Sequence, residues 1–381
     1  MANTLTALQP ILFSVAQEVS AEPFGAVDAI NTNFDSKGVA VGDVVKVPVA
    51  PTRAASDFVP SNVPPQGADA VASEVSVQIT KSRKTTMYLT GEQLRSLDNG
   101  ATSAEWIRQM VAQMMRTLRN EAEADCVAAI YQGASRATGS AGTNPFASAL
   151  TPLADVRKIL RDNGAPMADL QFVGDTTSEA NLLKLGVVLD ASIAGTDEER
   201  RSGLIRRQYG FNMRTSAGIE RHVAGAGTGY LINNALNEAI GETTLTLDTG
   251  TVNTTGIKAG DVITINGDTN QYVVNTGLTA AAGDIVIGRP GLIQAAANNA
   301  ALTIGASYTP NLAFERSAIV GIMRPPVMPA NPTISQTLIS DGMGMTYLLL
   351  DIAQYGQRTW ELHLAWGFKA VQPEHIATLL G

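Results

Sequence analysis

The sequence contains very little cysteine, histidine or aromatic side chain, and each shortage excludes a class of protein. Cys126 is the single cysteine among 381 residues, so a disulfide within the chain is impossible and a reducing compartment is expected. The three histidines lie far apart, at positions 222, 363 and 375, without the spacing of metal ligands. Aromatic residues make up 5% of the chain and are not interleaved with basic residues, unlike those of single-stranded nucleic-acid binders.

Long hydrophobic runs and an excess of positive charge are also missing. No run approaches the roughly 20 apolar residues of a membrane span. The first 17 residues carry no positive charge and include Pro10, so we expect no export signal and a cytoplasmic protein. The formal net charge is −8, whereas proteins that read nucleic acid present a basic face. This charge disfavours a DNA reader but allows a container whose wall must not grip DNA.

No group of residues in the sequence suggests a reaction. Gly225–Gly229 (GAGTG) resembles a phosphate loop, but the residues from Tyr230 onward predict no helix and lack the Gly-Lys-Ser/Thr ending. A domain linker is therefore favoured over a phosphate site. The acids and amides between residues 261 and 270 lack the spacing and closing glutamate of a calcium loop, and no Gly-x-Ser-x-Gly motif is present. We expect no enzyme activity and no cofactor.

Residues 42–90 are the most informative stretch that is present. Valines alternate from Val44 to Val49, and apolar residues alternate again from Val75 to Ile79, which predicts two strands. The residues between them carry four prolines and only one large apolar anchor, Phe58. A structureless loop of this length is generally functional or disordered. We predict a two-stranded arm without a core of its own, which must find its apolar partner on another molecule.

Residues 1–41 form an acidic N-terminal arm. Apolar residues recur at helical spacing over residues 5–19, and no Lys or Arg precedes Lys37. Glu18 and Glu22 belong to this acidic stretch. One interpretation is a solvated helix face, and the other is a docking site for a basic partner helix, because clusters of one sign attract the opposite charge.

A long spine helix is predicted over residues 103–132. Thr102 and Glu105 have the spacing of a capping box, and Gly133 is a stop signal. At 1.5 Å per residue the helix is on the order of 40 Å long. One apolar stripe runs along it, and its methionines favour a packed core over a cofactor site. The stripe comprises Ile107, Val111, Met114, Leu118, Ala122, Cys126 and Ile130, whereas Arg108, Arg116, Arg119 and Glu123 lie off it.

The remaining sequence predicts an α+β protein with an inserted β-domain. Helix and strand patterns mix from Pro152 to Arg221, with a helix ending at Gly164 and a short strand at Gln171–Val173. Short alternating runs separated by turn signals fill residues 242–304, as in a small antiparallel barrel. The strands Tyr347–Leu350 and Trp360–Trp366 and a short helix after Pro373 close the chain. The domains are thus an N-terminal arm (1–41), an extended two-stranded loop (42–90), a peripheral domain with the spine helix (91–165), the first part of an apical domain (166–224), an inserted β-barrel (225–308), and the apical return with closing peripheral strands (309–381).

This order of parts resembles the major capsid protein of tailed phages, which has the Hong Kong phage capsid fold. The segments Asn311–Ile319 (NLAFERSAI) and Met323–Pro326 (MRPP) look like the return into the apical domain. The segments Leu362–Phe368 (LHLAWGF) and Ala370–Glu374 (AVQPE) look like the closing strand and turn of the subgroup typified by the short-tailed Salmonella phage coat. The β-insertion near residue 225 also matches that subgroup, although its length of about 80 residues is shorter than expected for it.

The resemblance implies a structural protein of the virion that assembles in the host cytoplasm. Pentamers and hexamers of this chain would close into an icosahedral shell around double-stranded DNA, first on a scaffolding protein, with a portal at one vertex and a decoration protein as a further partner. The assembly contacts we expect are Glu18, Glu22, Phe58, Lys81, Arg83, Lys84, Arg108, Arg116 and Arg119. Two alternatives stay open: the shell of a bacterial nanocompartment, and an extracellular β-rich binding module.

Overall fold

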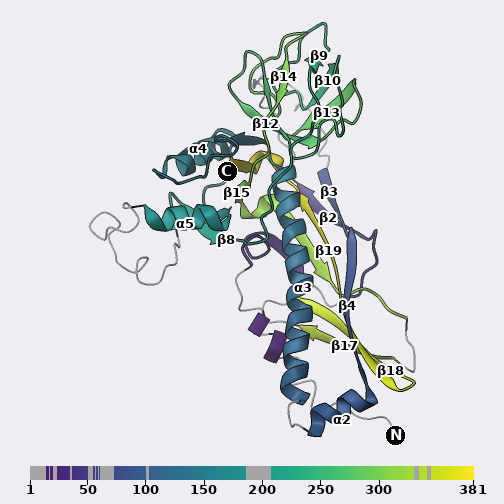
Figure 1. The fold of residues 1–381 in the computed structure, drawn as a ribbon. Coiled ribbons are helices and arrows are strands. Elements are labelled where there is room, and N and C mark those ends of the chain that lie inside the picture. Colours follow the sequence, from purple (N-terminus) through teal and green to yellow (C-terminus); the bar gives the residue numbers. More distant parts are fainter. Residues whose placement is uncertain are drawn as a thin grey trace.

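The computed structural model describes residues 14–16, 18–19, 24–34, 37–49, 55, 57–58, 60, 73–99, 103–185, 207–329, 334–340 and 345–381. Glu22 and Thr102 lie outside these residues. The described chain is elongated (Figure 1). Helix α2 (Gly91–Asn99) lies at one end and the spine helix α3 (Ser103–Gln132) runs along the body. The strands between Leu231 and Ile304 form a β-module beyond the far end of α3. The chain is a mixed α+β protein, as expected.

The spine helix has the predicted bounds because its apolar stripe has a helical period over its whole length. Every residue of the predicted stripe is buried, from Ile107 to Ile130. These side chains share the main core with Leu362, Leu364 and Trp366 of the long strand β19 (Gln357–Ala370). The prediction that the stripe belongs to a packed core is therefore confirmed.

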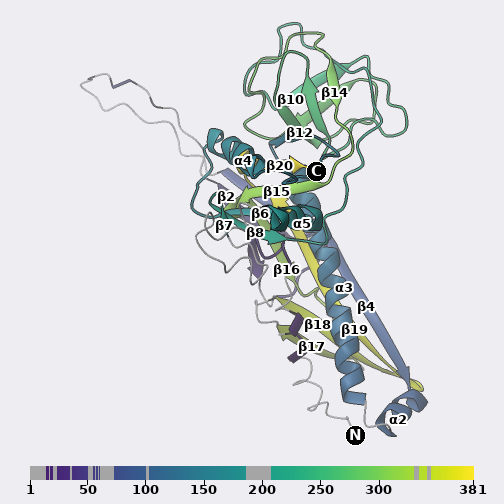
Figure 2. The same ribbon diagram turned by 60° about the vertical axis from the view of Figure 1, so that its left-hand side comes forward.

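The spine helix packs on a six-stranded sheet. Strand β19 is its centre and pairs antiparallel with β4 (Lys81–Thr90), β16 (Ile319–Arg324) and β18 (Thr346–Gln354). The sheet is completed by β17 (Ile334–Ser340), which pairs with β18, and by β1 (Asn31–Phe34), which runs parallel to β16. In Figures 1 and 2, β4 and β19 lie along the length of α3.

The extended arm is shorter than predicted. Strands β2 (Val44–Val49) and β3 (Ser73–Gln78) pair antiparallel, with Val49 opposite Ser73. Residues 81–90 leave this pair and form β4, which pairs with β19 along its whole length. The expectation that the arm has no core is wrong at its base. Val77 and Ile79 are buried there against residues of the sheet, including Ile322, Ala365 and Val371.

A second sheet carries the apical part of the chain. Its strands run in the order β7 (Arg207–Gln208), β8 (Phe211–Thr215), β6 (Leu170–Gly174), β15 (Pro310–Glu315), β20 (Ile376–Leu380) and β5 (Arg136–Thr138). Helices α4 (Thr151–Asp162) and α5 (Thr176–Lys184) pack against this sheet. The expected closing helix is wrong: after Pro373 the chain makes one 3₁₀ turn, η2 (Pro373–His375), and ends in β20, whose five residues are all buried. A second turn, η1 (Arg316–Ala318), joins β15 to β16.

The β-module has a core of its own, which includes Tyr230, Leu245, Ile263, Val274 and Ile285. Its strands are β9 (Leu231–Ile232), β10 (Thr244–Asp248), β11 (Val262–Ile265), β12 (Gln271–Thr276), β13 (Gly283–Ile287) and β14 (Leu302–Ile304). Strands β10 to β14 fall in residues 242–304, where the sequence predicts short strands. The insertion is not separate from the rest, because β12 pairs with β5 and so extends the apical sheet.

Candidate functional site

Glu123 of the spine helix holds the N-terminal segment in place. Its buried carboxylate accepts hydrogen bonds from the backbone N–H groups of Ala26, at 2.6 Å, and Val27, at 2.9 Å. The hydroxyl of Ser216, which directly follows strand β8, donates to the same carboxylate at 2.7 Å. A buried carboxylate is tolerated when several donors satisfy it. Glu123 thus joins the N-terminal segment, the spine and the apical sheet at one point.

Arg119 lies one helical turn before Glu123 and contacts the same segment. Its Nη2 atom lies 3.1 Å from Asp28 Oδ1, and its guanidinium carbon is 4.0 Å from the centre of the Phe24 ring. Burial raises the pKa of Asp28, although the positive charge of Arg119 acts in the opposite direction. Because Arg119 is fully buried, its position argues against the expected contact with a neighbouring subunit.

Glu18 also bonds to the spine. Its Oε2 atom lies 2.6 Å from Arg108 Nη2, and both side chains are about half exposed. The neighbouring Val15 and Val19 are buried in the main core, so the helical residues around Glu18 lie directly on α3. The predicted contacts Glu18 and Arg108 therefore form a pair within one chain. Their role toward a scaffold or a neighbour stays a prediction, and Glu22 lies outside the described residues.

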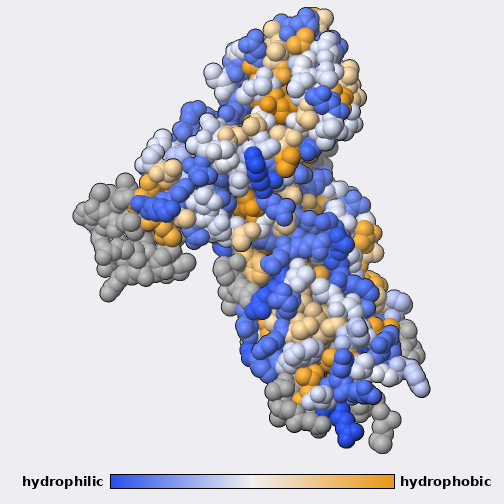
Figure 3. Space-filling view, viewed as in Figure 1, coloured by the Kyte–Doolittle hydropathy of each residue, from blue (hydrophilic) through white to orange (hydrophobic). Residues whose placement is uncertain are grey.

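The basic residues of β4 face two different surfaces. Lys81 Nζ lies 2.8 Å from Asp125 Oδ1, and Arg83 Nε lies 2.8 Å from Glu121 Oε1, so both pair with the spine helix. Trp366 of β19 also donates to Asp125, at 2.8 Å. Figure 3 shows hydrophilic surface gathered over the middle of the spine, where α3 and β4 adjoin. These pairs fix the edge strand to the helix.

Lys84 points to the opposite face of the sheet. Its Nζ atom lies 2.8 Å from Glu361 Oε1, and His363 Nε2 lies 3.1 Å from Glu361 Oε2. Burial lowers the pKa of His363, while the Glu361 carboxylate acts in the opposite direction. The pKa of Glu361 is lowered although burial would raise it, because its bonds to Lys84 and His363 favour the charged form.

Phe58 is the most exposed of the predicted contacts that the structure describes. Its side chain is 88% exposed, and the neighbouring described residues of the arm, at positions 55, 57 and 60, are exposed too. Arg116 lies half-buried on the spine helix. The arm thus combines a base that is packed on its own chain with an outer aromatic residue that is not.

Several sites rejected from the sequence can now be placed. Gly225, in the stretch that resembled a phosphate loop, donates its N–H to Asp261 of its own chain, and a strand follows rather than a helix. Among the residues that the structure describes, no group of three or more His, Cys, Asp or Glu side chains could hold a metal ion. None of the described helices is long and apolar enough to cross a membrane.

The contacts of three acidic residues of the spine helix were not predicted from the sequence. Glu121, Glu123 and Asp125 follow one another at intervals of two along the helix and so point to different sides. Glu123 turns toward the N-terminal segment, whereas Glu121 and Asp125 turn toward β4. The spacing of Arg119 and Glu123 indicates that they share one helix face beside the apolar stripe. This spacing could have predicted polar contacts at the edge of the core.

Comparison with solved structures identifies the fold. A chain of the capsid of cyanophage P-SCSP1u is similar, with a TM-score of 0.50 and 13% identity over 92% of this chain and 86% of that one. A chain of Mycobacterium phage Che8 has a TM-score of 0.45 and 12% identity, over 93% of this chain and 90% of that chain. A virus-like particle from Pyrococcus furiosus has a TM-score of 0.44 and 10% identity, over 97% and 98%.

No protein-family profile matches the sequence, and no curated protein matches it either. The likeness to the cyanophage capsid confirms the expected phage capsid fold. Membership of the short-tailed Salmonella phage subgroup stays a prediction.

Proposed function

We propose that the protein is the major capsid protein of a tailed phage, which assembles into an icosahedral shell around double-stranded DNA. The observation that carries this proposal is the arm: β2 and β3 are packed on the body at their base, while Phe58 beyond them is 88% exposed. A second copy of the chain can bury that ring. The capsid fold shared with the cyanophage chain supports the same function.

Contacts of this kind explain how a ring forms. An arm that reaches from one copy to a different surface of the next makes a heterologous contact, and such contacts close into rings when the rotation allows. Each contact can be weak because every copy makes many of them. Pentamers and hexamers formed in this way build the shell, on a scaffolding protein and with a portal at one vertex. The net charge of −8 suits a wall that encloses DNA without gripping it.

The finer assignments belong to the same proposal. We assign residues 225–308 as the inserted β-barrel of the short-tailed Salmonella phage coat subgroup, with the other domain boundaries as predicted. The independent core of this insertion supports the assignment. Glu18 and Glu22 are the proposed contacts with the scaffold or with a neighbouring subunit. Lys81, Arg83, Lys84, Arg108 and Arg116 are proposed to lie near contacts between subunits.

Shortening the arm tests the proposal. Replacing residues 50–72 by Asn-Gly joins Val49 to Ser73, which already face each other, through the two-residue turn that suits a hairpin. We expect a folded subunit by circular dichroism and no shells by sedimentation or negative-stain microscopy, in the presence of scaffold. Shells of normal size from this variant would overturn the proposed role of the arm.

A point variant with a matched control isolates the aromatic contact. Phe58→Ala should lower the yield of shells, because a buried aromatic ring contributes several kcal/mol at an interface, about 3–5. Tyr355→Ala removes another fully exposed aromatic side chain, in the turn between β18 and β19, and should assemble like the parent. Equal yields for the two variants would remove Phe58 from the contact.

The nature of the cargo separates the alternatives. A phage shell purified from infected cells contains nuclease-protected DNA, whereas a nanocompartment shell contains protein cargo. A chain that stays monomeric at high concentration with scaffold, and in every salt condition, would instead favour the β-rich binding module.

A further inference from the structure

The β-module is attached to the body by a buried polar cluster. The segment that leads into the module and the segment that leaves it pair at one point, where His222 and Tyr308 exchange backbone hydrogen bonds of 2.8 and 3.2 Å. His222 Nε2 lies 2.8 Å from Asp261 Oδ1, and both side chains are buried. Asp261 also accepts the backbone N–H groups of Gly225, at 3.0 Å, and Lys258, at 2.7 Å.

Aromatic rings join this cluster to the end of the spine helix. The His222 ring lies between Tyr131 of α3, with centroids 5.5 Å apart, and Tyr308, with centroids 5.3 Å apart. The Tyr308 hydroxyl donates to the carbonyl oxygen of Gly260 at 2.7 Å. A methyl group at position 260 would lie 2.5 Å from the Tyr131 ring, so only glycine lets the module approach the helix this closely.

The second attachment starts from the same end of the helix. Residues 133–135 connect α3 directly to β5, and β5 pairs with β12 of the module, with Arg136 opposite Tyr272 and Ala137 opposite Gln271. Both attachments therefore meet the body at the last turn of α3. A change in the direction of this turn would be passed to the module through both of them.

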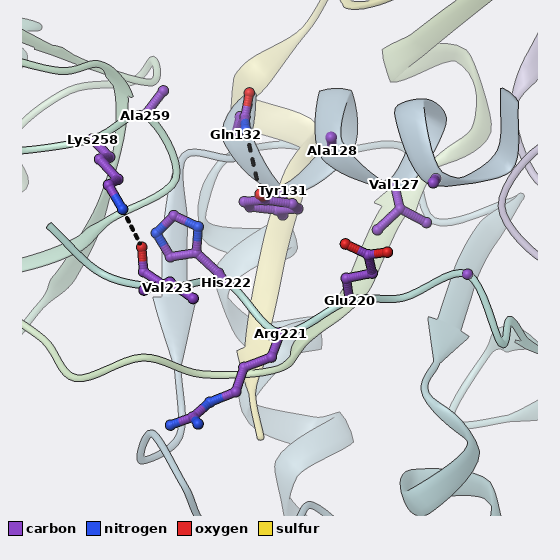
Figure 4. Close-up of a pocket in the computed structure, with 12 residues that line it drawn as sticks. Val127, Ala128, Tyr131, Gln132, Glu220, Arg221, His222, Val223, Lys258 and Ala259 are labelled. Carbon is purple, nitrogen blue, oxygen red and sulfur yellow. Dashed lines mark hydrogen bonds between the residues drawn. The ribbon is translucent and has the colours of Figure 1, made fainter. Parts of the chain in front are cut away.

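One side of the joint is open. A crevice of about 490 Å³ is lined by Val127, Ala128 and Tyr131 of the helix and by His222, Val223 and Lys258 on the other side. In Figure 4, His222 lies between Lys258 and Tyr131, and a single hydrogen bond of 3.0 Å links Lys258 Nζ to the carbonyl oxygen of Val223 at the exposed edge. The module thus has space on this side into which it could tilt.

We propose that His222 and Asp261 form a latch that sets the tilt of the β-module relative to the spine helix. The latch comprises these two side chains and the N–H groups of Gly225 and Lys258. With the latch closed, the module moves with the end of the helix as one body. With the His222–Asp261 bond removed, the module rocks toward the crevice while its own core stays folded. This inference concerns one chain and does not depend on the shell function.

Distance measurements between two spin labels test the latch. Gln113→Cys on α3 and Thr244→Cys on β10 place labels at exposed positions on the two sides of the joint, and the native Cys126 is buried. The full chain is labelled and diluted with unlabelled chain, so that distances between copies do not contribute. We expect one narrow distribution for the parent. His222→Phe keeps the ring but loses the bond, and should give a broader distribution that extends to shorter distances.

Tyr272→Phe is the matched control. It removes the hydrogen bond that the Tyr272 hydroxyl donates to Asp268 and the one that it accepts from the backbone N–H of Ile293. Both bonds lie inside the module and away from the latch side chains, so the distribution should stay narrow. Hydrogen exchange provides the second measurement. In His222→Phe the amides of Gly225 and Lys258 should exchange about tenfold faster, while those of β10 and β13 stay protected.

Each outcome decides the proposal. A distribution in His222→Phe that matches the parent, or equal broadening in Tyr272→Phe, overturns it. If β10 and β13 lose protection in His222→Phe, the module itself has unfolded. Asp261→Ala, which leaves no side-chain partner for His222, then replaces it under the same expectations, and an unchanged distribution in that variant likewise overturns the latch.

Discussion

The carboxylate of Glu123 accepts the backbone N–H of Ala26 at 2.6 Å, although 97 residues separate them in the sequence. This bond, with those from Val27 and Ser216, places one buried charge where three segments of the chain meet. In the proposed shell residues 24–28 are therefore part of the body of each subunit, as are Val15 and Val19, which are buried in the main core.

Glu123→Gln should destabilise the subunit by about 1–3 kcal/mol, because the amide cannot accept all three hydrogen bonds and its N–H group faces another donor. The shift in the midpoint of urea unfolding measures this loss. Glu121→Gln is the control on the same helix, where the partly exposed pair with Arg83 should contribute about 0–1 kcal/mol. Equal losses in the two variants would contradict the special position of Glu123.

A second prediction concerns the turn that Glu123 holds. A methyl group at position 25 would lie 2.5 Å from the carbonyl oxygen of Thr215, and backbone on both sides cannot yield easily. Gly25→Ala should therefore cost about 1–3 kcal/mol of unfolding free energy. The same measurement on Gly91→Ala, where nothing lies within 4 Å of the added methyl group, should show no loss or a gain of about 0.5–1 kcal/mol. A neutral Gly25→Ala variant would mean that the N-terminal turn does not pack against β8.

Elements that depend on a local sequence pattern were predicted better than elements that depend on contacts between distant parts of the chain. The spine helix was predicted to the residue because its apolar period is a local property of thirty residues. The end of the arm was not predicted, because no turn signal separates Ile79 from Lys81 in the sequence, and the partner strand β19 lies some 280 residues further on. The three-residue strand β5, which ties the insertion to the apical sheet, is too short to give any periodic signal.

The residues of the candidate site could be selected from the sequence, but their partners could not. Basic residues such as Lys81 and Arg83 could be selected from the sequence as contacts, yet whether their partners lie on the same chain depends on how β4 packs on α3. The Arg119 side chain is buried and the Arg108 side chain is partly exposed, although both residues lie off the apolar stripe of the same helix. A sequence does not give that distinction, since it depends on where the N-terminal segment crosses the helix.

The buried histidine of β19 predicts a dependence of stability on pH. Burial lowers the pKa of His363 below its ordinary value, so at mildly acidic pH the unfolded chain binds a proton that the folded chain does not. The unfolding free energy should therefore fall as the pH drops from about 7.5 to about 5.5. His363→Gln should reduce this fall, measured as the difference between urea midpoints at the two pH values. An identical fall in His363→Gln and the parent would exclude His363 as its source.

The pair of Glu18 with Arg108 allows the internal and external roles of the N-terminal segment to be separated. Glu18→Lys places two cations where the structure has an ion pair of 2.6 Å, and should cost about 0.2–1 kcal/mol in urea unfolding and lower the rate of assembly with scaffold. Glu18→Arg combined with Arg108→Glu restores the internal pair with its charges exchanged, and should restore the unfolding midpoint.

Assembly of the exchanged variant then decides between the two interpretations of the acidic N-terminal arm. If a basic scaffold helix docks on Glu18, the exchanged variant presents the wrong sign and should assemble slowly at low salt despite its normal stability, with the defect fading as salt screens the charges. If Glu18 only holds the segment on the spine, the exchanged variant should assemble like the parent at every salt concentration. Light scattering with scaffold at two ionic strengths distinguishes these outcomes, and parent-like kinetics would remove Glu18 from the docking surface while leaving the arm contact of Phe58 untouched.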